Sequence, residues 1–435
     1  MILTRPFLAV TLLPGPLRFS SVVLELWGHC GGVGRFEFRR RTAWAASASQ
    51  NLQVVRMASS HKEVPVAVVG AGVSGCVCAS TLAERGIPVT LFDMGRGPGG
   101  RMSSRREATD GGKEFLFDHG AQYFSVRFPD VQKLVDRWLA AGLVKEWKGK
   151  FGSYDRLKMA FQDETFEDDL PKYVGVPSMN SICKAMSRQP GIRSEFGTTV
   201  ASVKWKEEGA GGIWHLRSKT GEDLGAFRAV VVADKGLASD RFTATTGLPP
   251  PLEKAGVPTL YEKMANIKSV SVFVVMVAFA EPLTSVPFDR FTIERSNCLS
   301  GAVRLSNKPG RKVHDRSECW VLHSTVYYAN DIIKKEGLAK PSSAALDDIA
   351  NTLFKEFQEI VPAAPTPLFI KAHRWGSAFP MQAAAPEEHC LVESSRKMIA
   401  CGDYCVGPRI ECAILSGLAA ARNMQQILDS GSSKI

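Results

Sequence analysis

Three glycines in the spacing G-x-G-x-x-G, Gly70, Gly72 and Gly75, directly follow the apolar run VPVAVV. In a strand-to-helix turn the first glycine permits the tight turn and the second lets the backbone approach a pyrophosphate. The third lets the helix pack closely on the sheet. Ser74 adds a hydroxyl donor to the same turn. Because the free N–H groups of a helix start attract phosphate, this stretch predicts a dinucleotide-binding loop.

The elements that must hold this loop occur in the expected order. VPVAVV is typical of a buried strand, CVCASTLAERG of a helix that ends at Gly86, and VTLF of a second strand closed by Asp93. A carboxylate at that place can accept hydrogen bonds from a ribose diol, and it would repel the 2′-phosphate of NADP. The order of strand, helix, strand and acid therefore predicts a complete βαβ unit.

A second match to the same glycine pattern, GRGPGG, begins at Gly95. The residues after it, RMSSRREATDGGKEF, show no helical period, so no phosphate-binding helix is expected there. Gly99, Gly100 and Arg101 instead fit a loop that leans on the first site, because an arginine fork can pair with phosphate. The sequence thus favours one dinucleotide site over two.

Further motifs give this order a family resemblance. GGRM after the acid, FDHGAQYFS (117–125), VGVPSMNSICKAM (174–186), HRWGSAFP (373–380) and ACGDYCVGPRIECAILSGLAAA (400–421) follow one another along the chain. Together with the glycine loop they resemble the flavin amine oxidase superfamily, and within it renalase and its bacterial and plant relatives. The resemblance runs from about residue 64 to 428.

The resemblance implies an α/β fold, in which a Rossmann-like FAD-binding domain carries an inserted α+β substrate domain. This is the two-domain architecture of amine oxidases and p-hydroxybenzoate hydroxylase. Residues 64–150, 196–240 and 396–430 would form the discontinuous FAD-binding domain. Residues 151–195 and 241–395 would form the substrate domain.

The resemblance also implies FAD, bound non-covalently, and assigns residues to it. Gly70, Gly72, Ser74 and Gly75 would hold the pyrophosphate, Asp93 the adenosine ribose, and Val200 the adenine through its backbone. The remaining cofactor contacts would come from Gly99, Gly100, Arg101, Gln122, Tyr123, Gly402 and Asp403. A helix from about Ile410 would direct its N-terminus at the flavin. The chain departs from the family at KGLAS, which follows the strand VVVAD without the usual prolines, and at Cys412, where glycine is common.

Catalysis is expected from His119, Tyr123 and Trp375, with Gln122 and His373 also near the flavin ring. The implied reaction takes a hydride from a small-molecule substrate, such as a reduced nicotinamide isomer, and passes electrons to O2 or another acceptor. One alternative is a flavin-dependent amine oxidase, for which Lys371 would be the candidate lysine. The other is a non-redox or structural flavoprotein.

Composition excludes several other classes of protein. The 435 residues carry a net charge of +10, and residues 1–63, with eight basic and three acidic side chains, supply +5 of it. The rest has no basic cluster with stacking aromatics, so no nucleic-acid partner is expected. None of the ten cysteines lies in a zinc-ligand spacing, so no metal site is expected.

Three apolar segments are assigned to secondary structure. SVSVFVVMVAFA (269–280) is too short to span a membrane and is expected to be a buried strand. CWVLHSTVYYAN (319–330) is also expected to be a strand. Residues 342–361 carry Leu346, Ile349, Leu353 and Phe357 at helical spacing, which predicts a helix with a core-facing stripe.

The first 60 residues are rich in arginine, poor in acids, and resemble an organelle transit peptide or disordered leader. A chloroplast is favoured over a mitochondrion as the destination. Translation from Met57 would give a shorter, cytoplasmic protein.

Overall fold

The computed structural model describes residues 64–163, 170–208, 211–311 and 316–432. The predicted transit peptide and Met57 lie outside these ranges. Residues from Glu63 onward form one compact unit, to which all the elements below belong.

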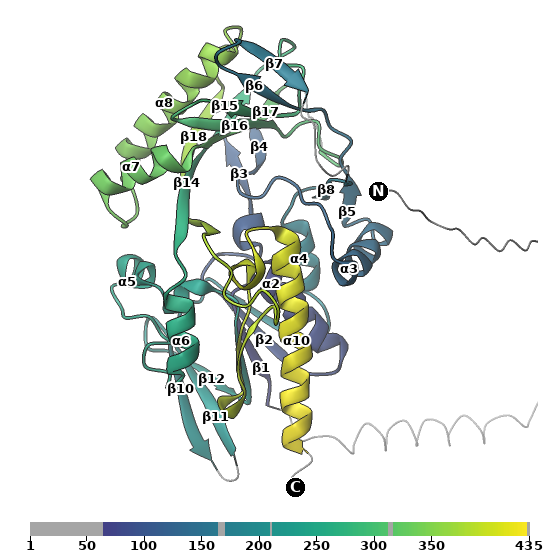
Figure 1. Ribbon diagram of the computed structural model, residues 1–435, viewed down its shortest axis with the longest axis vertical. Helices are drawn as coiled ribbons and strands as arrows, with labels where there is room; N and C mark the ends of the chain where they lie inside the picture. Colours follow the sequence, from purple (N-terminus) through teal and green to yellow (C-terminus); the bar gives the residue numbers. More distant parts are fainter. Residues whose placement is uncertain (1–63, 164–169, 209–210, 312–315, 433–435) are drawn as a thin grey trace, which may run out of the picture. The chain divides into compact units, whose positions relative to one another are not determined.

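A six-stranded sheet carries the predicted βαβ unit (Figure 1). Its strand order is β19-β20-β13-β1-β2-β9, and every neighbouring pair is parallel except β19 with β20. Its strands are β1 (Val66–Val69), β2 (Val89–Asp93), β9 (Ile192–Phe196), β13 (Ala229–Val232), β19 (Leu391–Glu393) and β20 (Met398–Ala400). The carboxyl ends of the parallel strands therefore meet at one edge, where ligands of such sheets bind.

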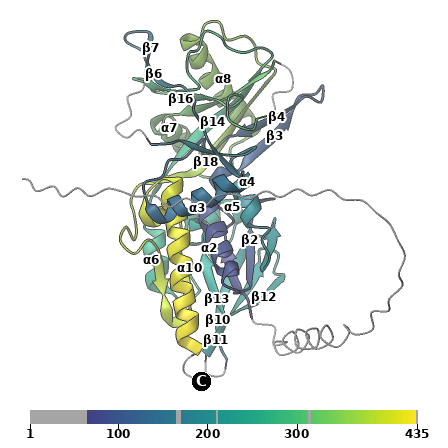
Figure 2. The same cartoon turned by 90° about the vertical axis from the view of Figure 1, so that its right-hand side faces the viewer.

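The side chains of β1 alternate between two apolar layers. Val66 and Val68 pack in the layer that also contains apolar residues of the helices, whereas Ala67 and Val69 pack on the opposite face. The helices of the first layer are α2 (Val73–Glu84), α3 (Pro129–Ala140), α4 (Ser181–Met186) and α10 (Ile410–Ser432), with α2 beside α10 (Figure 2). A sheet covered on both faces explains why its strands are continuous apolar runs.

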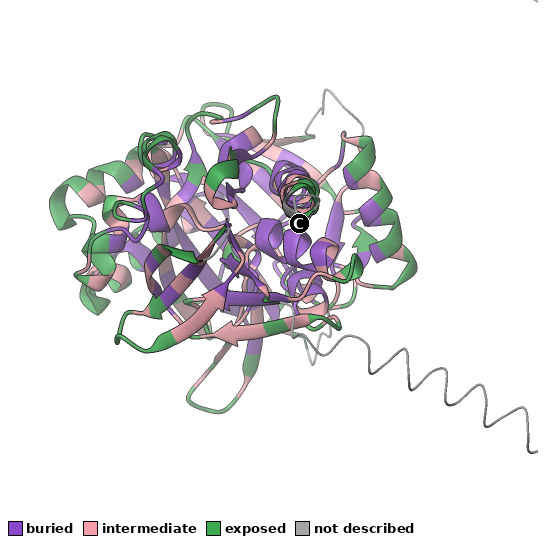
Figure 3. Cartoon of the chain, turned by 90° about the horizontal axis from the view of Figure 1, so that it is seen from below, coloured by how far each residue is buried: buried purple, intermediate pink, exposed green. Residues whose placement is uncertain are grey.

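The second face is covered by a three-stranded antiparallel sheet and two short helical segments. The strands are β10 (Val200–Glu208), β11 (Gly211–Ser218) and β12 (Asp223–Phe227); the helical segments are η2 (Lys235–Ala238) and α6 (Pro258–Ala265). Buried residues gather in the interior when the molecule is viewed from below (Figure 3).

A second, seven-stranded sheet has the strand order β18-β14-β17-β16-β15-β6-β7. Its strands are β6 (Phe151–Asp155), β7 (Ala160–Asp163), β14 (Ser269–Phe279), β15 (Arg290–Glu294), β16 (Leu299–Arg304), β17 (Glu318–Ser324) and β18 (Phe369–Pro380). One face packs on α7 (Val326–Glu336) and α8 (Ser343–Ile360). The other face joins the layer that contains α2 and α10.

The remaining elements are short. They are the hairpin of β3 (Ser104–Ala108) with β4 (Glu114–Asp118), the pair of β5 (Val144–Glu146) with β8 (Tyr173–Gly175), and the helical segments η1 (Gly100–Met102), α5 (Asp240–Thr246), η3 (Ser394–Arg396) and α9 (Asp403–Val406). β9 and β19 fall within the segments predicted for the substrate domain, yet both strands complete the six-stranded sheet. β9 pairs with β2, about a hundred residues earlier in the chain, so its own residues carry no sign of this pairing. β19 pairs with β20 across a short connection and belongs to the sheet only through that strand.

The predicted strand at 269–280 and the predicted helix at 342–361 are confirmed as β14 and α8. The prediction for 319–330 is wrong in its second half, because β17 ends at Ser324 and α7 begins at Val326. Thr325 accepts a hydrogen bond from the N–H of Tyr328 through its side chain and so caps the helix. This cap breaks a run whose β-branched and aromatic residues otherwise suggest a strand.

Candidate active site

A single cavity of about 1410 Å³ contains most of the residues predicted to do chemistry. It extends from the glycine loop after β1 to the face of the seven-stranded sheet that α7 and α8 leave uncovered. The predicted residues that line it are Gly70, Gly72, Ser74, Asp93, Gly99, Gly100, Arg101, His119, Gln122, Tyr123, His373, Trp375, Gly402 and Asp403. Gly75 and Val200 do not line it; Val200 is buried in the apolar layer beneath the three-stranded sheet.

The glycine loop has the conformation that its spacing predicts. Gly70 adopts φ +111°, which only glycine readily adopts. A Cβ at Gly75 would lie 1.9 Å from the carbonyl oxygen of Gly70, so the helix start and the turn are in closest backbone contact there. A Cβ at Gly72 would meet nothing within 4 Å, because this residue faces the cavity. Gly75 thus serves packing, while Gly72 leaves space for a ligand.

Asp93 closes the loop from the end of β2. Its Oδ2 accepts the N–H of Ala71 at 2.6 Å and its Oδ1 accepts the N–H of Gly95 at 2.7 Å. Burial raises the pKa of Asp93 to about 6, although both N–H groups favour the charged form. The carboxylate therefore ties the two glycine-rich loops together and still lines the cavity.

The residues around the loop fit a dinucleotide. Oγ of Ser74 is buried, lines the cavity, and has no oxygen or nitrogen partner among the described residues, its neighbour being the Cys401 thiol. A buried hydroxyl without a partner costs free energy unless a ligand bonds to it. Gly72 leaves room beside this hydroxyl for a pyrophosphate. Both features match the role that the motif assigns to this turn.

The second glycine match lies directly on the first. The N–H of Gly99 donates to the carbonyl of Ala71 at 2.8 Å, and Gly99 forms an isolated parallel bridge with Gly72. Gly100 adopts φ +50°, and a Cβ there would lie 3.2 Å from the Cα of Gly72. Only the three-residue η1 follows, so this loop is a wall of the same cavity and opens no helix of its own.

Arg101 and Asp403 were each expected to contact the cofactor, and the structure joins them to each other. The guanidinium forms two hydrogen bonds of 2.6 Å with the carboxylate oxygens and a third, of 2.9 Å, with the carbonyl of Ala378. The Asp403 side chain is 6% exposed and that of Arg101 41%. Burial lowers the pKa of Arg101, but Asp403, together with Asp234 and Tyr404, raises it by more. This bidentate pair joins the loop after β2 to the start of α9.

Sequence reasoning missed the charged group beneath Gln122. Lys308 is buried, and its Nζ lies 2.6 Å from the carbonyl oxygen of Gln122, 3.0 Å from its Oε1 and 3.2 Å from Oδ2 of Asp118. Arg311 also pairs with Asp118. Burial lowers the pKa of Lys308 to about 8 against the opposing effect of Asp118. Because an ammonium only donates, it fixes Oε1 as the side of the Gln122 amide that faces it.

Three aromatic side chains form one stack on the cavity wall. The ring centroid of His119 lies 5.0 Å from that of His373 and 4.9 Å from that of Trp375, whose Nε1 donates to the His119 carbonyl at 2.9 Å. The sequence does not predict His323, which also lines the cavity. Val274 of β14 pairs with His323 on one side and with His373 on the other. The alternation of each strand thus carries both imidazoles onto the same face of the sheet.

All three imidazoles are neutral at pH 7. Burial, followed by nearby positive charges, lowers the pKa of His119 to about 3, that of His373 to about 3 and that of His323 to about 4. Nδ1 of His119 is buried without a hydrogen-bond partner among the described residues. The stack therefore offers uncharged rings and an unused ring nitrogen.

These pKa values predict acid lability. Unfolded histidine binds its proton near pH 6.5, whereas buried His119 stays neutral, so stability is complete above pH 6.5 and falls as the pH drops below it. Between pH 6.5 and 5 the loss from one such group is about 2 kcal/mol. His119→Gln should remove that share, as measured by urea unfolding at both pH values. An unchanged pH slope in the variant would contradict the assignment.

Tyr123 lies among aromatic rings and cations at the sheet end of the cavity. Its ring is 5.5 Å from that of Phe151, and the Arg290 guanidinium lies 5.9 Å from its centroid. Lys172 lies 4.9 Å from the Phe151 centroid. Lys371, in contrast, is not a cavity residue: its side chain is 49% exposed and pairs with Glu107 at 3.0 Å.

The long helix predicted from Ile410 is confirmed as α10. Glu411 in its first turn is buried and accepts the N–H of Arg127 at 2.7 Å. Cys412, where relatives often have glycine, is buried too. Its sulfur would be 3.6 Å from a Cβ placed on Gly407, which is an ordinary van der Waals distance. The cysteine is therefore accommodated without a clash at this turn.

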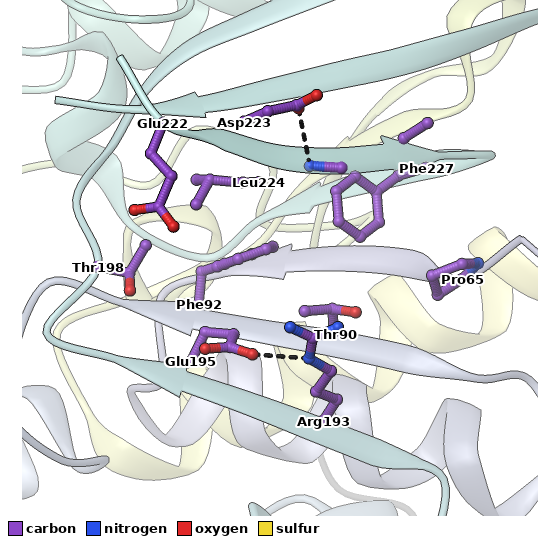
Figure 4. A pocket seen from close by; sticks show the side chains of 12 residues that line it. Pro65, Thr90, Phe92, Arg193, Glu195, Thr198, Glu222, Asp223, Leu224 and Phe227 are labelled. Atoms are coloured by element: carbon purple, nitrogen blue, oxygen red, sulfur yellow. Dashed lines mark hydrogen bonds and ion pairs between the residues drawn. The ribbon is translucent and has the colours of Figure 1, made fainter. Parts of the chain in front are cut away.

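A second, smaller cavity of about 280 Å³ lies between β2, β9 and β12 (Figure 4). Three of its charged side chains have partners within the protein: Nε of Arg193 donates to Glu195 at 2.6 Å, and Asp223 accepts the N–H of Gly225 at 3.0 Å. Within the described ranges no cluster of side chains could hold a metal ion. No helix in the described part of the chain is long and apolar enough to cross a membrane.

Comparisons with known proteins agree with this geometry. Residues 68–138 match the family described as NAD(P)-binding Rossmann-like domain, and residues 138–425 match the family described as flavin containing amine oxidoreductase. Among solved structures, an oxidoreductase from Methanosarcina mazei has a TM-score of 0.57 at 13% identity, covering 82% of this chain and all of the other. Wild-type putrescine oxidase bound to putrescine has a TM-score of 0.55 at 11% identity, covering 84% and 99%. These similarities confirm the predicted fold class.

Curated relatives match over shorter stretches. The bifunctional protein MnmC of tRNA 5-methylaminomethyl-2-thiouridine biosynthesis from Marinobacter nauticus is 23% identical over 209 residues, which are 39% of this chain and 31% of that protein. A 4,4'-diapophytoene desaturase from Staphylococcus haemolyticus is 46% identical over 70 residues, 16% of this chain and 13% of that one. This chain therefore matches less than a third of the length of either relative.

Proposed function

This chain belongs to the flavin-containing amine oxidoreductase family, and from that membership we propose a renalase-like, FAD-dependent oxidase. Its substrate would be a small reduced molecule, namely a reduced nicotinamide isomer, and its electron acceptor would be O2. FAD would bind non-covalently. The chain would be an oxidoreductase with one dinucleotide site that serves the cofactor and one adjoining chamber that serves the substrate.

The observation that carries this proposal is the distribution of charge along the cavity. The acidic residues lining it are Asp93, Asp234 and Asp403, all of which follow strands of the six-stranded sheet at the cofactor end. Cations line the cavity along its whole length, Arg96, Arg101 and Lys235 among them. Beside the seven-stranded sheet, however, the described lining has no carboxylate, and Lys172 and Arg290 lie among aromatic and neutral imidazole rings. Such a chamber attracts a flat, neutral or anionic donor.

The residues divide the work between binding and orientation. Gly70, Gly72 and Ser74 would hold the pyrophosphate, and Asp93 the ribose. Bound FAD would supply the chemistry of hydride acceptance. Trp375 and Tyr123 provide apolar walls that exclude water from the reacting carbon. His119, neutral and with an unused Nδ1, would accept a hydrogen bond from the substrate and so orient it, because a pKa of about 3 makes it a weak proton acceptor.

The second candidate function is amine oxidation, which the similarity in fold to putrescine oxidase raises. Among the described residues no carboxylate lines the cavity beside the seven-stranded sheet, so an ammonium substrate would find no counter-charge there. Lys371, the candidate lysine for that chemistry, lies outside the cavity. The third candidate, a structural flavoprotein, predicts that no donor reduces the flavin.

One experiment separates these functions. The flavin-loaded protein is mixed without oxygen with each reduced nicotinamide isomer and with putrescine, and bleaching of the flavin absorbance is followed; air is then admitted. We expect bleaching by a reduced nicotinamide isomer and fast reoxidation in air. Bleaching by putrescine alone would establish the amine oxidase, and no bleaching by any donor would leave the structural flavoprotein.

We also propose that residues 1–60 direct the chain to the chloroplast. The support is their content of arginine and scarcity of acids. Fluorescent fusions of the full chain and of a chain starting at Met57 should differ, the first in the organelle and the second in the cytoplasm. The same location for both would refute the targeting role.

A further inference from the structure

The segment after β13 is where this chain departs from its family, and it forms a wall of the cavity. In place of the prolines of many relatives it reads KGLAS, which forms η2, followed by α5. Oγ of Ser239 accepts the N–H of Arg241 at 3.1 Å and so caps the start of α5. Arg241 is thereby fixed in the first turn of a helix that borders the cavity.

The Arg241 side chain lies over a glycine of the opposite wall. A Cβ at Gly376 of β18 would stand 1.2 Å from one terminal nitrogen of the Arg241 guanidinium. Both residues line the cavity. The guanidinium therefore occupies the volume that any other side chain at 376 would need, and the strand and the helix together form a seat for it.

This guanidinium lacks protein partners, unlike the arginines around it. Within the described part of the chain its nitrogens donate no hydrogen bond. Arg374 donates to the carbonyls of Gly337, Leu338 and Ala339, and Arg105 contacts both Glu107 and Nδ1 of His373. The Arg241 donors are thus free to bind a ligand.

The charges near Arg241 also favour the binding of an anion. Burial lowers its pKa, and Asp234 is the carboxylate that opposes the effect. Arg241 in turn lowers the pKa of Arg374 and of His373, so three basic side chains share this wall. Because Asp234 makes no hydrogen bond with the partly buried guanidinium, the planar fork of Arg241 remains able to bind an anion through two hydrogen bonds.

We propose that Arg241, seated on Gly376, forms an anion-binding subsite of the cavity that takes a phosphate or phosphate ester. Resting on the proposed function, this assigns the phosphate to the reduced substrate, so that the substrate is a phosphorylated nicotinamide compound and not the free base. The same chemistry would also capture free inorganic phosphate or pyrophosphate. The subsite is built from residues of α5 and β18, whereas the glycine loop that serves the cofactor follows β1.

The test uses the full-length, FAD-saturated protein, so that the cofactor's own pyrophosphate occupies the glycine loop. Inorganic pyrophosphate is titrated by calorimetry into the wild type, Arg241→Gln and Arg241→Lys, with Arg193→Gln as a control. Arg193 is an exposed arginine paired with Glu195 in the other cavity. We expect Arg241→Gln to weaken binding about tenfold or more, Arg241→Lys to weaken it less, and Arg193→Gln to leave it unchanged.

A matched pair of substrates then distinguishes the source of the phosphate. Reduced nicotinamide mononucleotide carries one phosphate, and reduced nicotinamide riboside carries none. The wild type should show a KM about tenfold lower for the phosphorylated compound, and Arg241→Gln should abolish this preference by raising the KM for that compound alone. Equal KM values in the wild type, with pyrophosphate binding still dependent on Arg241, would assign the subsite to a free anion and overturn its role in substrate binding.

The proposal and the proposed function fail in different ways. If neither nicotinamide compound is oxidised, the proposed function fails, while the pyrophosphate titration still decides the subsite. Pyrophosphate that binds Arg241→Gln as tightly as the wild type overturns the subsite itself. If the protein takes up no FAD, the titration is repeated with Ser74→Ala. Pyrophosphate binding that is lost in Ser74→Ala but kept in Arg241→Gln would place the anion at the glycine loop and would also overturn the Arg241 subsite.

Discussion

Gly72→Ala gives a folded protein that has lost its affinity for FAD, whereas Gly75→Ala gives a protein that does not fold stably. The Cβ at Gly72 meets no protein atom within 4 Å and points into the cavity, so only a ligand would feel it. The Cβ at Gly75 would stand 1.9 Å from a backbone oxygen that cannot move without opening the turn. Two glycines of one motif thus have separable roles.

The expected sizes differ accordingly. Gly75→Ala should lower the free energy of unfolding by about 3 kcal/mol or more, because the clash forces backbone apart in a close-packed layer. Gly72→Ala should lower it by about 1 kcal/mol, the cost of a poorer helix cap, and weaken FAD binding at least tenfold, or about 1.4 kcal/mol. Urea unfolding and fluorescence titration with FAD measure the two quantities. Equal FAD affinity in Gly72→Ala would exclude a pyrophosphate at this turn.

Arg101→Ala should weaken FAD binding about tenfold to a hundredfold. The substitution removes a guanidinium that lines the cavity and also leaves the Asp403 carboxylate, only 6% exposed, without its bidentate partner. An uncompensated carboxylate at the cofactor end would repel the phosphates of FAD. The dissociation constant for FAD measures the effect, and unchanged affinity would return this loop to a purely structural role.

A double-mutant cycle separates these two contributions. Asp403→Asn in the Arg101→Ala background removes the lone charge, so the double variant should bind FAD more tightly than Arg101→Ala alone. Arg85→Ala is the control, because Arg85 is exposed and bonds Gln425. If the double variant binds no better than the single one, the guanidinium itself contacts the cofactor and repulsion by Asp403 is irrelevant.

The parts of the fold that the sequence could predict are those with local signals. Gly70, Asp93 and the helix between them follow from the order of apolar runs, small residues and one acid within a single βαβ unit. The stripe of Ile349, Leu353 and Phe357 follows from helical period alone. In each case the information lies within about one or two elements, where periodicity and turn chemistry act.

The contacts that the sequence could not predict join residues far apart in the chain. Arg101 and Asp403 are 302 positions apart, and Lys308 and Gln122 are 186 apart. Whether a lysine stays exposed or lies beneath a cavity residue is decided by which sheets pack together, and no local pattern marks it. Lys308 follows the end of β16, and only the pairing of that sheet brings it beneath Gln122.

The position of Arg241 is a further feature that no local pattern predicts. Arg241 closely follows KGLAS, the segment that departs from the family pattern. Its place over Gly376 depends on β18, more than a hundred residues later in the chain. VYYAN is helical and not a strand for a local reason, since the side chain of Thr325 caps the helix and outweighs the strand preference of Val326 and the two tyrosines. Long-range packing and short caps were thus the two sources of error.

The central claim is that one cavity holds one non-covalent FAD, and the flavin content of the purified protein tests it most directly. The full-length protein is incubated with FAD, freed of excess, and its flavin absorbance is compared with that of the supernatant after acid denaturation. We expect a yellow protein with one FAD per chain, and we expect acid denaturation to release all of this FAD intact into the supernatant. A colourless protein that takes up no FAD would contradict the account.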